Sequence, residues 1–397
     1  MPAPAPTSFW RWETPAMTEQ STVSESALEP AQLIALNAVS GVSRAAICQL
    51  ASSRERWWPA RGKLSAADAR ALGVSVKQLA AARIAVQDRD GFVARELDAA
   101  ESRTVEIITI LDASYPQPLR ELALPPPVLY IRGSLRQRPS LSIVGARHAS
   151  SYGRDVAAGL ATGLTERGLT IVSGFARGID AAAHRAAARA EGGSTLAILG
   201  CGLDIDYPRG RDRLRQEVAA NGALVSEFPF GTAPLRQNFP VRNRLIAALG
   251  HGTLVVEATA RSGSLITARL ALELGREVYA VPGRIFDNRA HGPNTLIRDG
   301  AFLVQHPRDI LETLPQQIHD QLRPEEKPNQ KTATPRLPPE QAQIIELLPP
   351  GSEVGSDELA RESGLGVEKV GALLLELEIG GWVRRRPGAV FARTDLW

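Results

Sequence analysis

The chain has 397 residues with 46 basic and 43 acidic side chains, which gives a formal net charge of +3, and 44% of its residues are hydrophobic. This composition is that of an ordinary globular protein of two or three domains and excludes a wholly disordered chain. The two cysteines, Cys48 and Cys201, exclude a disulfide scaffold and a cysteine-ligated zinc site, and they favour a reducing compartment.

Residues 1–26 are rich in Pro, Ser, Thr and Glu and contain no apolar stretch of the kind found in a secretory signal. We expect this segment to be a disordered leader. No apolar run along the chain reaches the roughly 18 residues that a membrane span needs. We therefore expect a cytoplasmic protein.

Residues 27–98 predict a module of short helices. Apolar residues recur at helical spacing over Leu33–Val39 and, after Gly41, over Ala45–Leu50. The same turn-plus-helix pattern returns at Ser65–Leu72 and Ser75–Ala82. This pattern is typical of a small all-helical domain of the SAM or helix-hairpin-helix kind.

Residues 105–314 predict an α/β domain, because apolar runs ending at turns alternate with amphipathic helical stretches near 152–167, 179–191, 211–221, 240–249, 264–275 and 307–314. The apolar runs are continuous rather than alternating, as a parallel sheet covered on both faces requires. We predict a doubly wound, mostly parallel sheet. Its expected strands are Leu141–Gly145, Leu169–Gly174, Ser194–Leu199, Ala223–Ser226, Thr253–Ala258, Glu277–Val281 and Ala301–Val304.

Residues 315–339 are poor in apolar side chains and rich in Pro, Gln, Glu and Lys, which predicts a linker. Residues 340–397 predict a winged-helix domain, since three helices are followed by a hairpin around Pro387-Gly388. The expected helices are Glu340–Leu348, Asp357–Glu362 with Ser356 as its cap, and Val367–Ile379, and the expected strands are Trp382–Arg386 and Ala389–Arg393.

Four turns of the central domain follow predicted strands and carry glycine, and in two of them an arginine lies adjacent to the glycine turn. Ligands of doubly wound sheets bind at this edge, where helix N-termini and glycine amides favour anions and arginine binds phosphate in a bidentate manner. We predict a phosphate-binding site there, although a tight turn can require glycine for structural reasons alone. The candidate residues are Gly145, Arg147, Ser150, Ser173, Gly174, Arg177, Gly178, Arg209, Arg211, Ser262, Gly263 and Ser264.

The segment from Arg236 to Arg244 combines three arginines with amide side chains and an aromatic ring at a predicted helix start. Arginine binds backbone phosphate, amides bond base edges, and a phenylalanine ring stacks a base of a single strand. The alternative is a solvated basic helix start with the ring as a core side chain. The candidate residues here are Arg236, Asn238, Phe239, Arg242, Asn243 and Arg244.

Other sites are less well supported by the sequence. No lysine lies between residues 78 and 326, so the central domain contains no Walker A loop. Gly200-Cys201-Gly202 begins like a dinucleotide-binding motif, but Ile205 occupies the third glycine position. Asp180 and His184 lie one helical turn apart, which permits an acid–base pair, yet we expect a structural role next to the site. We therefore expect neither a cofactor nor a metal.

Several of these runs, in this order, resemble the DNA-processing protein A (DprA/Smf) family over about residues 112–305. They are Val144–Arg147, Ser173–Asp180 with His184, Gly200–Asp204 with Tyr207-Pro208, Phe239-Pro240 with Arg242–Arg244, Ser262–Ala268 and Pro282-Gly283. The resemblance departs at Phe175, where the family usually has leucine.

The resemblance implies an extended Rossmann-like domain that binds single-stranded DNA without catalysing a reaction. It also implies protection of incoming DNA, loading of the RecA recombinase during natural transformation, and a homodimer formed through this domain. By its motifs, the principal DNA-contacting cations would be Arg147, Arg209 or Arg211, and Arg236.

Two other functions remain open. A Rossmann-like nucleotide hydrolase would bind at a similar edge, but its Pro-Gly-Gly-x-Gly-Thr signature is replaced here by Ala260–Ser264. A winged-helix regulator would contact DNA through its third helix, which carries Glu368, Glu376 and Glu378 against the single Lys369. The Arg384–Arg386 run in the wing suits phosphate better, so we expect a modest contribution from this domain.

Overall fold

The structure is a computed structural model. It describes residues 29–39, 46–47, 50, 65–71, 73–87, 89–136, 138–324, 337–349, 352–380, 382–386 and 388–393. The predicted leader over 1–26, Cys48 and residues 325–336 of the predicted linker lie outside the described residues.

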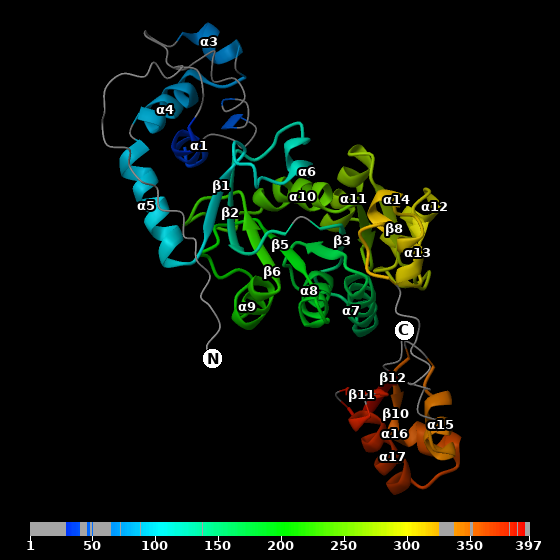
Figure 1. The fold of residues 1–397 in the computed structure, drawn as a ribbon. Coiled ribbons are helices and arrows are strands. Elements are labelled where there is room, and N and C mark those ends of the chain that lie inside the picture. Colours follow the sequence, from blue (N-terminus) through cyan, green and yellow to red (C-terminus); the bar gives the residue numbers. More distant parts are fainter. Residues whose placement is uncertain are drawn as a thin grey trace.

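A nine-stranded sheet forms the centre of the protein, in the order β1-β2-β6-β5-β4-β3-β7-β8-β9 (Figure 1). Strands β3 to β9 pair in parallel, while β2 runs antiparallel to both β1 and β6. This confirms the predicted doubly wound α/β fold. The strands are β1 (Glu106–Thr109), β2 (Val128–Gly133), β3 (Ser140–Val144), β4 (Thr170–Ser173), β5 (Thr195–Leu199), β6 (Gly222–Ser226), β7 (Gly252–Val255), β8 (Glu277–Ala280) and β9 (Phe302–Leu303).

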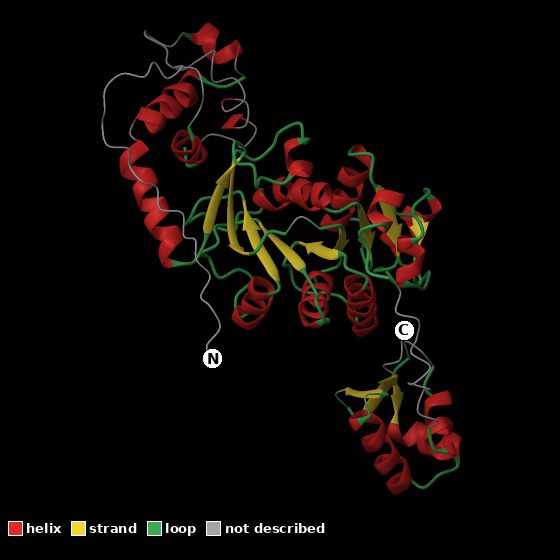
Figure 2. Cartoon of the chain, viewed as in Figure 1, coloured by secondary structure: helices red, strands yellow, loops and turns green. Residues whose placement is uncertain are grey.

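The seven predicted strands are all present, and β1 and β2 are additional. Helices cover both faces of the sheet, which explains why its strands are apolar throughout (Figure 2). One face carries α7 (Ser151–Glu166), α8 (Ile179–Arg189), α9 (Asp212–Ala220) and α13 (Pro307–Leu311). The other carries α6 (Gln117–Arg120), α10 (Asn238–Leu249), α11 (Gly263–Glu273) and α12 (His291–Arg298).

The central domain continues beyond its expected end at residue 314. Helix α14 (Gln316–His319) follows, and Ile318 and Leu322 pack against the core under α7. Arg167 donates a hydrogen bond from Nε to the carbonyl of Arg323 at 3.0 Å. These apolar contacts are spaced too widely in a Gln-rich stretch for the sequence to indicate them.

The N-terminal helices are α1 (Pro30–Asn37), α3 (Ala66–Ala71), α4 (Val76–Gln87) and α5 (Arg89–Ser102). Helices α1 and α5 share a core with β2, β5 and α9. Buried polar contacts also join them to the sheet, since Asn37 donates to the carbonyl of Glu227 at 3.1 Å and the Tyr130 hydroxyl donates to Glu96 at 2.8 Å. The helical module is therefore packed onto the sheet.

The C-terminal residues form a winged-helix domain with its own core, as predicted. Its elements are α15 (Pro339–Glu346), β10 (Val354–Gly355), α16 (Ser356–Ser363), α17 (Val367–Ile379), β11 (Val383–Arg386) and β12 (Val390–Arg393). Ser356 is the first residue of α16, and Gly355 takes the cap position that the sequence pattern assigns to Ser356. None of the described helices could cross a membrane.

Candidate nucleic-acid interface

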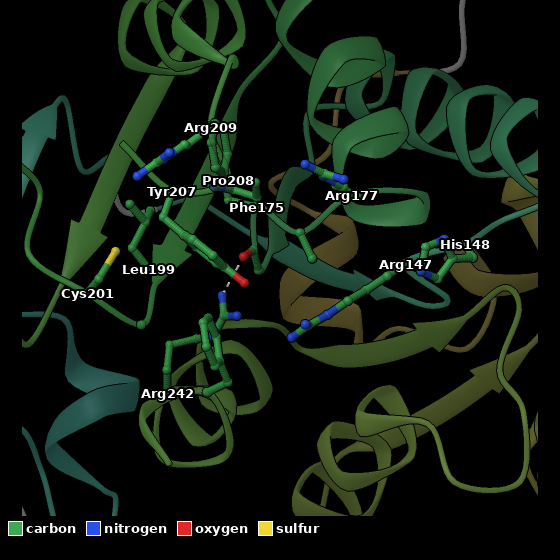
Figure 3. A pocket seen from close by; sticks show the side chains of 14 residues that line it. Arg147, His148, Phe175, Arg177, Leu199, Cys201, Tyr207, Pro208, Arg209 and Arg242 are labelled. Carbon is green, nitrogen blue, oxygen red and sulfur yellow. Dashed lines mark hydrogen bonds between the residues drawn. The ribbon is translucent and has the colours of Figure 1, made fainter. Parts of the chain in front are cut away.

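Parallel pairing of β5, β4 and β3 brings the turns that follow these strands to one edge of the sheet. A cavity of about 410 Å³ opens between the turns (Figure 3). Its walls come from three strand–helix connections and from the start of α10. The lining residues are Arg147, His148, Gly174, Phe175, Ala176, Arg177, Leu199, Gly200, Cys201, Tyr207, Pro208, Arg209, Phe239 and Arg242.

Phe239 is half-buried in this cavity and has a cation and a ring beside it. The guanidinium carbon of Arg147 lies 5.3 Å from the Phe239 ring centroid, which is cation–π distance. The Tyr207 ring centroid lies 5.5 Å away at an interplanar angle of 41°. Gly200 makes room for the ring, because a Cβ at this position would lie 3.0 Å from Cδ1 of Phe239. The cavity therefore presents an aromatic ring beside an exposed cation.

Three exposed arginines line the cavity: Arg147, Arg177 and Arg209. None of them forms an ion pair with a carboxylate among the described residues. Figure 3 shows Arg147, Arg177 and Arg209 on separate sides of the cavity. Guanidinium groups without counter-ions at a concave surface create a positive potential that attracts an anion.

Arg242 has a different environment, since it is buried at the base of the cavity with 4% of its surface exposed. Its Nη1 donates to the carbonyl of Gly174 at 2.7 Å and also to the carbonyl of Ile198. Burial lowers the pKa of this guanidinium to about 10, against the opposing effect of Asp180. Arg242 thus ties the ends of β4 and β5 together through Nη1.

Asp180 and His184 are both buried in α8. Asp180 accepts hydrogen bonds from the amides of Gly174 and Ala176 at 3.1 and 3.2 Å. Nδ1 of His184 lies 2.7 Å from the Thr195 hydroxyl, and burial lowers the pKa of the imidazole to about 3. Burial also raises the pKa of the Cys201 thiol to about 11. At neutral pH the imidazole and the thiol are uncharged, and the described residues contain no cluster suited to a metal.

Two of the predicted anion-binding turns already hold a carboxylate of the protein. Asp180 takes the amides of the turn after β4. Glu257 accepts from the amide of Ser150 at 2.9 Å and from its hydroxyl, and Ser150 in turn caps α7 through the amide of Gly153. An internal carboxylate meets the same need for negative charge at a helix N-terminus as a phosphate would. The positive charge of the site therefore comes from side chains.

The remaining candidate residues are spread over this edge. The Ser173 hydroxyl donates to the carbonyl of Ile143 at 2.6 Å. Gly178 has a φ of 78°, and a Cβ at this residue would collide with the carbonyl oxygen of Ala146. Arg236 is exposed just before α10. Gly145, Ser262, Gly263, Ser264, Asn238, Asn243, Arg211, Arg236 and Arg244 lie outside the cavity lining.

Arg244 and the two asparagines contact protein groups. Arg244 forms a 2.6 Å ion pair with Glu227, whose side chain is 1% exposed. Asn243 donates to the carbonyl of Gly263 at 3.4 Å and Asn238 to that of Ala233 at 3.3 Å. Within this segment Arg236 therefore faces solvent. Arg244 and the two asparagines instead hold α10 in place.

Sequence reasoning did not assign a role to several lining residues, notably His148, Phe175 and Tyr207. Tyr207 could have been found, because it directly follows the loop after a predicted strand and precedes a proline. Phe175 has a positive φ of 57°, an unusual backbone conformation for a bulky residue, and its ring is 1% exposed. No local sequence signal indicates that conformation.

Comparison with known proteins agrees with this architecture. Residues 106–315 match the family described as DNA recombination-mediator protein A, and residues 327–389 match the DprA winged helix domain. Protein Smf of Escherichia coli K12 is 43% identical over 279 residues, which are 69% of this chain and 74% of that protein. The X-ray structure of DNA processing protein A from Streptococcus pneumoniae superimposes with a TM-score of 0.63 at 34% identity, covering 72% of this chain and 99% of that chain.

Proposed function

Because the chain belongs to the DNA recombination-mediator protein A (DprA/Smf) family, we propose that it binds single-stranded DNA at the cavity around Phe239. In this proposal it protects the incoming strand and loads a RecA recombinase onto it during natural transformation. The family description names a mediator of recombination, and the function proposed here requires no catalytic step and no cofactor.

The observation that carries the proposal is the arrangement of Arg147 and Phe239. An aromatic ring accepts the face of any base, and stacking on it contributes about 1–3 kcal/mol per base. The neighbouring guanidiniums of Arg147 and Arg209 would hold the phosphates on either side of that base, and Arg236 extends the basic surface at the start of α10. Bases of a duplex are stacked on each other, so this geometry favours an unpaired strand.

The geometry gives less support to an enzyme. A dinucleotide would need its pyrophosphate on free amides at a helix N-terminus, whereas the amides of Gly174 and Ala176 are bonded to Asp180. A nucleotide hydrolase of the kind considered from the sequence would use the loop at Ala260–Ser264, and this loop does not line the cavity.

We also propose that the protein forms a homodimer through the sheet domain. Strand β9 lies at the edge of the sheet, and its Phe302 and Leu303 side chains are 42% and 45% exposed. Apolar side chains on an unpaired edge favour association with another chain. Sedimentation of Leu303→Glu tests this, since we expect the variant to be a monomer.

Titration with labelled oligothymidylate tests the DNA-binding proposal. We expect Arg147→Glu and Arg236→Glu each to weaken binding at low salt, and the slope of log affinity against log salt to fall by about 0.7 for each phosphate that the variant no longer neutralises. Arg269→Glu is a matched control, because Arg269 is an exposed arginine on α11. Unchanged affinity in both test variants would show that the strand does not bind at this cavity.

A further inference from the structure

A second concave surface, which we call the arginine groove, lies beside the cavity. It has a volume of about 440 Å³ and is formed by the turn after β4, the loop before α9, and the facing sides of α8 and α9. Its lining consists of Arg177, Arg185, Arg189, Arg209, Gly210, Arg211, Arg213, Leu214 and Glu217.

The charge of the arginine groove is far from balanced. Six arginines and one glutamate line it, a local charge of +5, whereas the entire chain carries +3. Glu217 is already engaged, since it accepts from Arg189 at 2.9 Å and from Arg213 at 3.1 Å. Among the described residues, no carboxylate forms an ion pair with the other four arginines of the groove.

These unpaired cations crowd one another. Partial burial lowers the pKa of Arg211, and the charges of Arg185 and Arg177 lower it further. Like charges held together in this way destabilise the folded protein unless an anion binds between them. The pairs of Arg189 and Arg213 with Glu217 hold those two side chains along the edge of the groove.

The arginine groove is continuous with the cavity, because Arg177 and Arg209 line both. Its lining contains no aromatic ring, and Leu214 is its only large apolar side chain. It therefore offers contacts to phosphate and none that would stack a base. An anion bound in the arginine groove would therefore lie close to a ligand bound in the cavity.

We propose that the arginine groove holds the phosphates of the strand segment adjacent to the base in the cavity, so that one single strand occupies both surfaces. This inference rests on the proposed function and extends it, because it assigns DNA contacts to Arg185, Arg189 and Arg213. These contacts do not depend on the base sequence of the DNA. They add to the affinity only when the strand is long enough to reach from the cavity into the groove.

The test compares oligothymidylates of increasing length on the full-length protein. The double variant Arg185→Gln/Arg213→Gln changes two residues that line the groove but not the cavity. It should bind the shortest oligomers that still bind with the same affinity as the unmodified protein. For long oligomers it should lose roughly tenfold in affinity, and its salt slope should fall by about 1.4, or 0.7 for each of two phosphates. Arg269→Gln/Arg298→Gln removes two exposed arginines from α11 and α12 on the other face and serves as the control.

A second variant is expected to bind more tightly, and damage to the fold could not explain such a result. Glu217→Gln removes the single carboxylate of the groove and releases Arg189 and Arg213. We expect it to bind long oligomers several-fold more tightly and short oligomers unchanged, since negative charge in the groove opposes phosphate.

The outcomes separate this inference from the proposed function. If Arg147→Glu abolishes binding while the groove variants match the control at every length, DNA binding stands and the groove inference is wrong. If the groove variants bind all oligomers normally and fail only in loading the recombinase, the groove is a protein-docking surface and the inference is also wrong. If Arg147→Glu itself has no effect, the proposed function fails.

Discussion

Arg242 and Asp180 hold the two polar groups of a single residue, Gly174. Nη1 of Arg242 donates to its carbonyl at 2.7 Å, and Oδ2 of Asp180 accepts from its amide at 3.1 Å. A Cβ at residue 174 would lie 2.6 Å from Nη1 of Arg242 and 2.8 Å from Oδ2 of Asp180, so only glycine fits. The base of the cavity is thus built by opposite charges from α10 and α8, the helices on the two faces of the sheet.

This arrangement predicts that Arg242→Met is strongly destabilising. The substitution leaves the carbonyls of Gly174 and Ile198 without their donor and leaves Asp180 buried without its counter-charge. Leaving a buried polar group without its hydrogen-bond partner costs about 1–3 kcal/mol in the free energy of unfolding, and two carbonyls lose their donor here. Urea denaturation measures it, and the exposed Arg269→Met should stay within about 0.5 kcal/mol of the unmodified protein. A loss for Arg242→Met as small as that of the control would show that the buried contacts contribute little.

Phe239→Ala should weaken single-strand binding without unfolding the protein. Stacking of one base on an aromatic ring contributes about 1–3 kcal/mol, so we expect a loss of roughly five- to 150-fold in affinity. Phe286→Ala is the control, because Phe286 is 94% exposed and lies outside the cavity. Fluorescence anisotropy with oligothymidylate measures both. Equal affinities for the two variants would rule out stacking on Phe239.

His184 predicts a pH dependence of stability. Its pKa in the folded protein is about 3, below the ordinary 6.5, so the unfolded chain binds a proton between these values and the folded protein does not. The stabilisation is therefore complete above pH 6.5 and is lost as the pH falls towards 3. At 1.36 kcal/mol per pH unit, this contributes roughly 2 kcal/mol of lost stability between pH 7 and pH 5.

The measurement for His184 is the free energy of unfolding at pH 7 and pH 5. Asp180 acts in the opposite direction, since burial raises its pKa, so the informative quantity is the difference between the unmodified protein and His184→Gln. We expect the variant to be less stable at pH 7 and to depend less on pH. The same dependence in both proteins would mean that folding does not shift the pKa of His184.

Removal of residues 330–397 should preserve most of the single-strand affinity. In the wing, Arg384 and Arg386 both pair with Asp155 of α7, and Lys369 of α17 pairs with Glu340. These cations are therefore neutralised within the protein. Titration of the truncated protein with oligothymidylate measures the effect, and loss of most of the affinity would contradict it.

The contact between the winged-helix domain and α7 should also respond to salt, because exposed ion pairs contribute only about 0–1 kcal/mol each and are screened. Asp155→Asn should release the domain at lower salt than the unmodified protein does, as measured by small-angle scattering. A scattering profile identical to that of the unmodified protein at all salt concentrations would show that other contacts hold the domain.

The sequence alone predicted the parallel sheet, the winged helix and the edge at which the cavity opens. These features depend on local patterns, namely continuous apolar strands, helical periodicity and glycine turns, which the chain carries within a few residues. Strands β1 and β2 were not predicted, because they pair antiparallel at the sheet margin, where the strand-helix alternation is absent.

Only the tertiary structure decided which basic side chains are exposed at the cavity. Arg147, Arg242 and Arg244 look alike in the sequence, but the first lies exposed over Phe239, the second is buried on backbone carbonyls, and the third is paired with Glu227. Likewise, Glu257 occupies the N-terminus of α7 from 107 residues away in the chain. Whether a charge is available to DNA depends on partners that are distant in sequence and adjacent in space, and no local pattern contains that information.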